Sequence, residues 1–233
     1  MINKIIEGDC LKSLREMPDK SVNCCITSPP YYGLRDYGTA NWVGGDKGCD
    51  HVQSENKHGG QRADRNQEGY KKQYNSLCGK CGANRIDSQI GLEETPEQFV
   101  EQLVQVFREV KRILKDDGTL WLNLGDSYCG SGVNNGETNP GLSNNAKRGD
   151  HTKSKRPNSK INGIKPKDLI GIPWMVAFAL RADGWWLRQD IIWSKKNPMP
   201  ESVTDRCTKA HEYIFLLSKS KQYYFDNDAI RGP

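Results

Sequence analysis

Residues 27–32 read Thr27-Ser28-Pro29-Pro30-Tyr31-Tyr32, a stretch in which two prolines separate two hydroxyl residues from two tyrosines. Residues 22–26, directly before it, are β-branched or apolar apart from one asparagine and are typical of a buried strand. The prolines cannot continue that strand, because neither has an N–H group for the ladder. The chain therefore leaves a sheet at Ser28 and places Tyr31 at a strand end, where ligands lie in open α/β sheets.

A rigid corner of this composition suits a flat ligand that carries an amino group. The Ser28 hydroxyl and the prolyl carbonyls can accept hydrogen bonds from the amine, and Tyr31 can stack on the attached ring. An extruded nucleobase held for chemistry on its exocyclic nitrogen has these features. We therefore expect Ser28, Pro29, Pro30 and Tyr31 to be the catalytic residues.

Three further blocks of the sequence match one protein family in the same order. They are residues 5–10 (Ile-Ile-Glu-Gly-Asp-Cys), 123–128 (Asn-Leu-Gly-Asp-Ser-Tyr) and 211–217 (His-Glu-Tyr-Ile-Phe-Leu-Leu). With the corner, they make the chain resemble the amino-group DNA methyltransferases, which modify N4 of cytosine or N6 of adenine. The resemblance covers nearly the whole chain outside its loops. It implies methyl transfer from S-adenosylmethionine to a flipped base of double-stranded DNA, in the subgroup whose catalytic block comes first.

The resemblance also implies roles for individual residues. Ser28 and the Pro29 carbonyl would accept the hydrogens of the target amine. Asp9 would contact the cofactor's adenosine together with Cys10, and Asp126 is a further implied cofactor contact. Asp9 also fits the N-cap of a short helix, which is compatible with a cofactor contact. Serine at the first motif position favours N4 of cytosine over N6 of adenine, since adenine enzymes carry Asp or Asn there.

Strands and helices alternate along the rest of the chain, which predicts an α/β domain. Strands are predicted at residues 2–7, 22–26, 119–124, 185–193 and 213–218, with 223–225 as a further candidate, and helices at 10–17, from Pro96 to about 115 and at 173–184. The second helix starts with a capping box, Thr95-Pro96-Glu97-Gln98. We expect one domain over residues 1–233 with a doubly wound, mostly parallel sheet of the S-adenosylmethionine-dependent methyltransferase type.

Two short motifs bracket a long polar segment and predict an insertion at residues 49–81 that binds zinc. Cys49-x-His51 and Cys78-x-x-Cys81 offer three sulfurs and one nitrogen, a tetrahedral set with no open position, so the zinc would be structural. His58 is a reserve ligand. The alternatives are free cysteines in a loop or a redox pair, and the Cys-x-x-Cys motif neither opens a predicted helix nor follows a predicted strand.

A second long loop, residues 129–165, is rich in Gly, Asn and Ser and then turns basic. We expect it to be mobile and to contact DNA phosphates through Lys147, Arg148, Lys153, Lys155 and Arg156. The alternative is a solvated loop without a partner. The formal net charge of +5 permits a nucleic-acid partner without requiring one.

Composition excludes several classes of protein. No apolar run approaches the roughly 18 residues of a membrane helix, and the N-terminal residues lack the apolar core of a signal peptide. We therefore expect a cytoplasmic protein without a membrane partner, in which the eight cysteines are not paired in disulfides.

One part of the family pattern is missing from these 233 residues. The resemblance implies a Phe-x-Gly-x-Gly turn that holds the cofactor, and none occurs. We expect a C-terminal segment or a second chain to complete the cofactor site, and an unpaired apolar edge on the strand at 22–26. Two alternatives remain: a zinc-containing DNA-binding fragment without activity of its own, and a methyltransferase of RNA or of protein amides.

Overall fold

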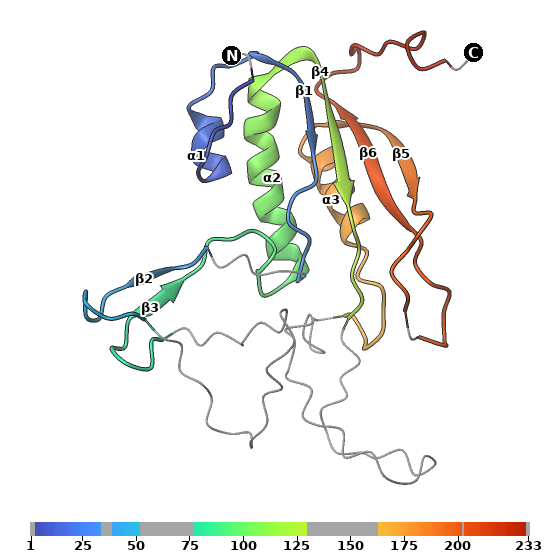
Figure 1. Cartoon of the computed structure of the whole chain (residues 1–233). Coiled ribbons are helices and arrows are strands. Elements are labelled where there is room, and N and C mark those ends of the chain that lie inside the picture. The colour runs from blue at the N-terminus through green and yellow to red at the C-terminus, as the bar shows by residue number, and fades with distance from the viewer. Residues whose placement is uncertain (1–2, 34–38, 52–76, 130–162, 202, 232–233) are drawn as a thin grey trace.

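The computed structural model describes residues 3–33, 39–51, 77–129, 163–201 and 203–231 (Figure 1). Its elements are, in chain order, α1 (Cys10–Arg15), β1 (Val22–Thr27), β2 (Asn41–Val43), β3 (Asn84–Ile86), α2 (Pro96–Ile113), β4 (Leu114–Leu124), α3 (Ile172–Ala182), β5 (Trp186–Ser194) and β6 (His211–Ser218). Four strands form one sheet in the order β1-β4-β6-β5, and β2 pairs with β3 separately.

The sheet is mixed, so the predicted mostly parallel sheet is wrong for the described strands. Only β1 and β4 are parallel, whereas β6 runs antiparallel to both β4 and β5. The reason is connectivity: α2 lies between β1 and β4 in the chain and allows a parallel crossover, but β6 follows β5 through a loop and returns between β5 and β4. Among the described helices, α2 and α3 pack together and share one core with the strands, so the predicted double winding is not seen in this part of the chain.

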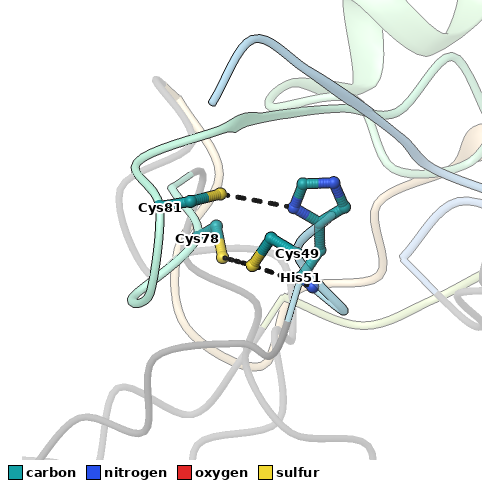
Figure 2. A group of neighbouring side chains, drawn as sticks. All are labelled: Cys49, His51, Cys78 and Cys81. Carbon is teal, nitrogen blue, oxygen red and sulfur yellow. Dashed lines mark hydrogen bonds between the residues drawn. The ribbon is translucent and has the colours of Figure 1, made fainter. Parts of the chain in front are cut away.

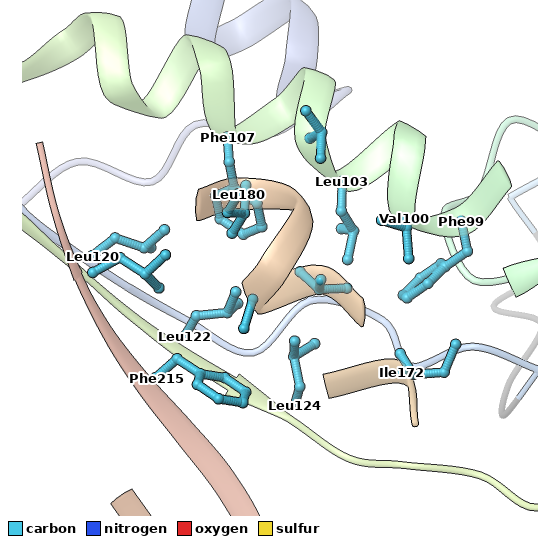
Figure 3. Packing of buried hydrophobic residues seen from close by; sticks show 14 of the residues in the cluster. Phe99, Val100, Leu103, Phe107, Leu120, Leu122, Leu124, Ile172, Leu180 and Phe215 are labelled. Atoms are coloured by element: carbon cyan, nitrogen blue, oxygen red, sulfur yellow. The ribbon is translucent and has the colours of Figure 1, made fainter. Parts of the chain in front are cut away.

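That core forms because α2 presents an apolar stripe to the strands, as Figure 3 shows. The predicted capping box is confirmed: Thr95 Oγ1 accepts from the Gln98 backbone N–H, and the Gln98 side chain accepts from the Thr95 N–H. Phe107 is fully buried, whereas its neighbour Val106 is partly exposed. The main fully buried side chains are Phe99, Leu103, Phe107, Leu120, Leu122, Leu124, Ile172, Leu180 and Phe215. Within the described residues, no helix is long and apolar enough to span a membrane.

The N-terminal segment differs from the prediction. Residues 3–7 are not a strand, and Ile5 is 95% exposed, because no described strand lies beside them to complete a ladder. Asp9 caps α1 as expected, with its carboxylate accepting from the Lys12 N–H at 2.9 Å. Arg112 of α2 then donates to the carbonyl of Leu14 at 2.8 Å, which holds the end of α1 against α2.

At the periphery of the fold, some strand predictions are confirmed and others are wrong. β1 pairs only with β4 among the described strands, which confirms the expected edge, and Ile26 on it is 81% exposed. Residues 223–225 do not form the candidate strand. β2 and β3 were not predicted as strands, because three-residue strands show no readable alternation.

The N-terminus of α3 is capped by a residue from outside the helix. Gly171 occupies the N-cap position with φ 84° and has no side chain to offer. The Asp126 carboxylate, two residues beyond β4, accepts instead from the N–H groups of Gly171 (3.0 Å), Ile172 (3.0 Å) and Ser127 (2.9 Å). It therefore satisfies N–H groups that would otherwise lack partners at the start of the helix.

Asp126→Ala should lower the free energy of unfolding by about 1–3 kcal/mol, because it leaves these part-buried N–H groups without an acceptor. Urea denaturation measures the change. Asp126→Asn is the matched control, since it keeps one acceptor oxygen and should cost less than the alanine variant. An alanine variant as stable as the wild type would contradict this role.

Candidate active site

The Ser28–Tyr31 corner lies at the carboxyl end of β1, beside the carboxyl end of β4. Because β6 is antiparallel to β4, the start of β6 reaches the same edge, where Tyr213 pairs with Leu124. The end of β5 also arrives there, since Ser194 pairs with His211. Side chains from four strands thus meet at the edge of the sheet where α/β proteins bind ligands.

A hydrogen-bond network joins the corner to β4 and β6. Asn123 Oδ1 lies 3.1 Å from Ser28 Oγ and 2.8 Å from the Tyr31 hydroxyl. An amide oxygen can only accept, so the Ser28 hydroxyl donates toward it, whereas the Tyr31 hydroxyl has one proton for two acceptors, Asn123 Oδ1 and the Glu212 carboxylate. The Tyr31 hydroxyl also lies 3.0 Å from Glu212 Oε2, and Asn123 Nδ2 donates to the Tyr213 carbonyl at 3.2 Å. The last contact fixes the orientation of the Asn123 amide.

Charge and burial keep this network in one protonation state. Burial raises the pKa of Glu212, but hydrogen bonds from Lys195 and Tyr31 outweigh it and hold the pKa below its usual range. Burial raises the pKa of Tyr31, and the negative charge of Glu212 adds to the increase. At neutral pH, Glu212 is therefore a carboxylate that accepts, paired with Lys195, and Tyr31 is a neutral phenol that donates.

The ring of Tyr31 packs directly on the backbone of β4's end. A Cβ atom at Gly125 would lie 2.5 Å from Tyr31 Cε2 and 2.8 Å from Cδ2, so only glycine admits the ring in this position. On the other side of the corner, the Gly33 N–H donates to the Gly91 carbonyl at 2.8 Å. The corner is thus held between the end of β4 and the segment that follows β3.

The predicted cofactor contacts occupy two different places. Asp9 caps α1 and Cys10 is its first residue, whereas Asp126 caps α3 beside the corner. These capping roles leave the cofactor contacts as predictions. The predicted DNA contacts, Lys147, Arg148, Lys153, Lys155 and Arg156, lie outside the described residues.

Sequence reasoning assigned no role to Asn123, Gly125, Glu212 or Lys195. A signal was available for the first three, because they belong to the blocks 123–128 and 211–217 that match the family. Lys195 carries no such signal. Only the antiparallel pairing of β5 with β6 places it beside Glu212.

The four predicted metal ligands do come together. The donor atoms of Cys49, His51, Cys78 and Cys81 all lie within 4.8 Å of one another (Figure 2). Cys49 and His51 follow β2, and the other two precede β3, so the pairing of these strands brings the motifs side by side. The reserve ligand His58 lies outside the described residues. None of the eight cysteines forms a disulfide bond.

A family model described as DNA methylase matches residues 22–233. The chain belongs to this family of amino-group DNA methyltransferases. The match includes the corner, Asn123, Gly125 and Glu212, which are the residues that the structure joins in one network.

Curated relatives agree with the family. The chain is 43% identical over 227 residues to Type II methyltransferase M.Cfr9I of Citrobacter freundii, covering 97% of this chain and 58% of that protein. It is 41% identical over 230 residues to Type II methyltransferase M.SmaI of Serratia marcescens, covering 99% of this chain and 60% of the relative. The chain thus spans about three fifths of the length of these relatives.

The fold has a counterpart among solved structures. The PvuII DNA methyltransferase, described as cytosine-N4-specific, superposes with a TM-score of 0.50 at 16% sequence identity, covering 97% of this chain and 53% of that one. At this identity the similarity concerns the fold alone.

Gly125→Ala should lower the free energy of unfolding by about 1–3 kcal/mol, because the new methyl group overlaps the Tyr31 ring. The same substitution in a Tyr31→Ala background should cost much less, and a double-mutant cycle by urea denaturation measures the difference. Gly48→Ala is the control, since its Cβ would meet nothing closer than 3.6 Å. Equal costs in both backgrounds would show that the ring does not pack on Gly125.

Proposed function

We propose that this chain is the base-holding part of a DNA methyltransferase that acts on the exocyclic amine of a flipped base, with N4 of cytosine favoured over N6 of adenine. The observation that carries the proposal is the orientation of Ser28 at the sheet edge of a chain from the DNA methylase family. Ser28 Oγ lies 3.1 Å from Asn123 Oδ1, which can only accept, so Ser28 donates in this contact and can still accept from a ligand.

The reaction needs alignment of the amine more than it needs acid or base strength. Ser28 Oγ and the Pro29 carbonyl would each accept one amine hydrogen, which localises the nitrogen lone pair for attack. Tyr31 would stack on the base, and its ring is held by Gly125 below and by its hydroxyl contacts with Asn123 and Glu212. Such fixed geometry is what lowers the barrier in a direct displacement.

S-adenosylmethionine would supply the electrophilic methyl group when bound. In this chain Asp9, Cys10 and Asp126 remain the proposed contacts, and no Phe-x-Gly-x-Gly turn is present in residues 1–233. The relatives extend well beyond the shared region. We therefore propose that a further segment or a second chain supplies the rest of the cofactor site.

Two other functions are less well supported. A DNA-binding fragment without a methyltransferase role would not need the contact of Ser28 with Asn123 or the part-buried contacts of Tyr31. RNA or protein amides as acceptors fit the corner chemically, but the family that matches the chain is described as DNA methylase.

The target base is decided by nucleoside mass spectrometry of duplex DNA treated with the protein extended to the length of its relatives. We expect N4-methylcytosine, and N6-methyladenine as the only product would refute this preference. The 1–233 chain alone serves as the control and should transfer no methyl group, because part of the cofactor site is missing. Turnover by that chain would show that its cofactor site is already complete. RNA and protein acceptors, tested in parallel, should remain unmethylated.

The basic loop is tested separately. Replacing Lys153, Lys155 and Arg156 with alanine should weaken binding to all DNA sequences alike. Each lost phosphate contact should reduce the slope of log affinity against log salt by about 0.9. Fluorescence anisotropy over a range of salt concentrations measures the slope. An unchanged slope would mean that these side chains do not contact the backbone.

A further inference from the structure

We propose that Cys49, His51, Cys78 and Cys81 bind one structural zinc ion that stabilises the β2–β3 pair and, through it, the Ser28–Tyr31 corner. The four donor atoms converge, the backbone packs closely around them, and β3 leads from them to the corner, whether or not the chain takes part in methyl transfer.

The distances are those of a tetrahedral zinc site. With Zn–S bonds of about 2.3 Å, two tetrahedral ligands place their sulfurs about 3.8 Å apart. Cys49 Sγ and Cys78 Sγ are 3.8 Å apart. With a Zn–N bond of about 2.0 Å, a sulfur and a nitrogen ligand lie about 3.5 Å apart. Cys81 Sγ and His51 Nδ1 are 3.5 Å apart. Two independent pairs thus have the edge lengths of one coordination tetrahedron.

The alternatives fit these distances less well. A disulfide would bring two sulfurs to about 2.05 Å, far closer than the observed separation. Cysteines that share no ligand are not expected to bring their sulfurs together. Cys49 and Cys78 are 29 residues apart in the chain, yet all four donor atoms lie within 4.8 Å of one another. A shift of about 1 Å would bring the widest pair to the tetrahedral edge. Four protein ligands leave no open position, so the zinc would be structural and not catalytic.

The surrounding backbone contacts the sulfurs closely. The His51 N–H donates to Cys49 Sγ at 3.3 Å. Gly45, with φ 71°, approaches Cys81 so closely that a Cβ atom there would lie 2.7 Å from the sulfur. The other face of the site is covered by Trp42, whose ring stacks on His51 with centroids 5.3 Å apart. These contacts hold His51 with Nδ1 toward the sulfurs, as Figure 2 shows.

A short segment, residues 86–91, connects the site to the corner. β3 leads into Asp87, which forms an ion pair with Arg85 at 2.9 Å, with both side chains only 12% exposed. The path continues to Gly91, whose carbonyl accepts from the Gly33 N–H at 2.8 Å. A Cβ atom at Gly91 would lie 2.9 Å from the Tyr31 carbonyl, so the two backbones are in direct contact. Loss of zinc should therefore loosen β2–β3 first and the Gly33 amide next.

Metal content is the first test. The 1–233 chain, purified after expression in zinc-supplemented medium, should carry about one zinc per chain by mass spectrometry of the metal. Cys78→Ser should lose it, whereas Cys207→Ser, which removes an exposed cysteine far from the site in sequence, should retain it. A wild-type chain without zinc, or a Cys78→Ser chain that keeps a full equivalent, would overturn the proposal.

The wild-type chain gives a second test in case Cys78→Ser fails to fold. Replacing zinc with Co²⁺ should produce the visible absorption of a tetrahedral ion and the charge-transfer bands of cobalt–thiolate bonds. Chelation should then speed amide exchange at residues 77–91 by about tenfold or more and at Gly33 to a smaller extent, with α2 unchanged and with reversal on adding zinc. An octahedral cobalt spectrum would exclude this site, and unchanged exchange at Gly33 would exclude the link to the corner.

Discussion

The two prolines after β1 impose the constraint on which the rest of the site depends. Neither Pro29 nor Pro30 can donate to a ladder, so β1 must end at the edge of the sheet while β4 continues beside it. The chain that leaves β1 then turns back, and Tyr31 comes to lie on the end of β4. A strand that continued by even two residues would occupy the place of Tyr31, and Asn123 would have a backbone neighbour instead of two hydroxyl groups.

The sequence predicted best where a local pattern decides the structure. The capping box at Thr95, the N-cap at Asp9 and the apolar stripe of α2 depend on neighbours in the chain, and the structure confirms them. Strand direction and pairing depend on distant segments, which explains the errors at residues 3–7 and in the expected parallel sheet. β2 and β3 were missed for the same reason, since each is too short to show a period and exists through the other.

The residues of the candidate site also differ in how far a local sequence pattern could predict them. Ser28 and Tyr31 could be predicted, because their residue types and order carry the chemistry. Asn123 and Glu212 could be placed in matching blocks but not given a role, since only the register of β4 with β6 shows that both face Tyr31. Lys195 could not be predicted at all. Its role depends on how the end of β5 meets the start of β6, which no local pattern records.

Asp126 couples this edge of the sheet to the helical core. The residue directly follows Gly125, on which the Tyr31 ring lies. Its carboxylate accepts from the first N–H groups of α3, whose other residues fill the core. The corner therefore cannot fray as an independent loop, because movement of the segment at 125–126 would also uncap a core helix. Sites on flexible loops open at little cost, but this one should open only with a substantial part of the domain. Its rigidity is thus set by the cooperativity of the core, and sequence changes deep in α3 should alter the mobility of Tyr31 without touching it.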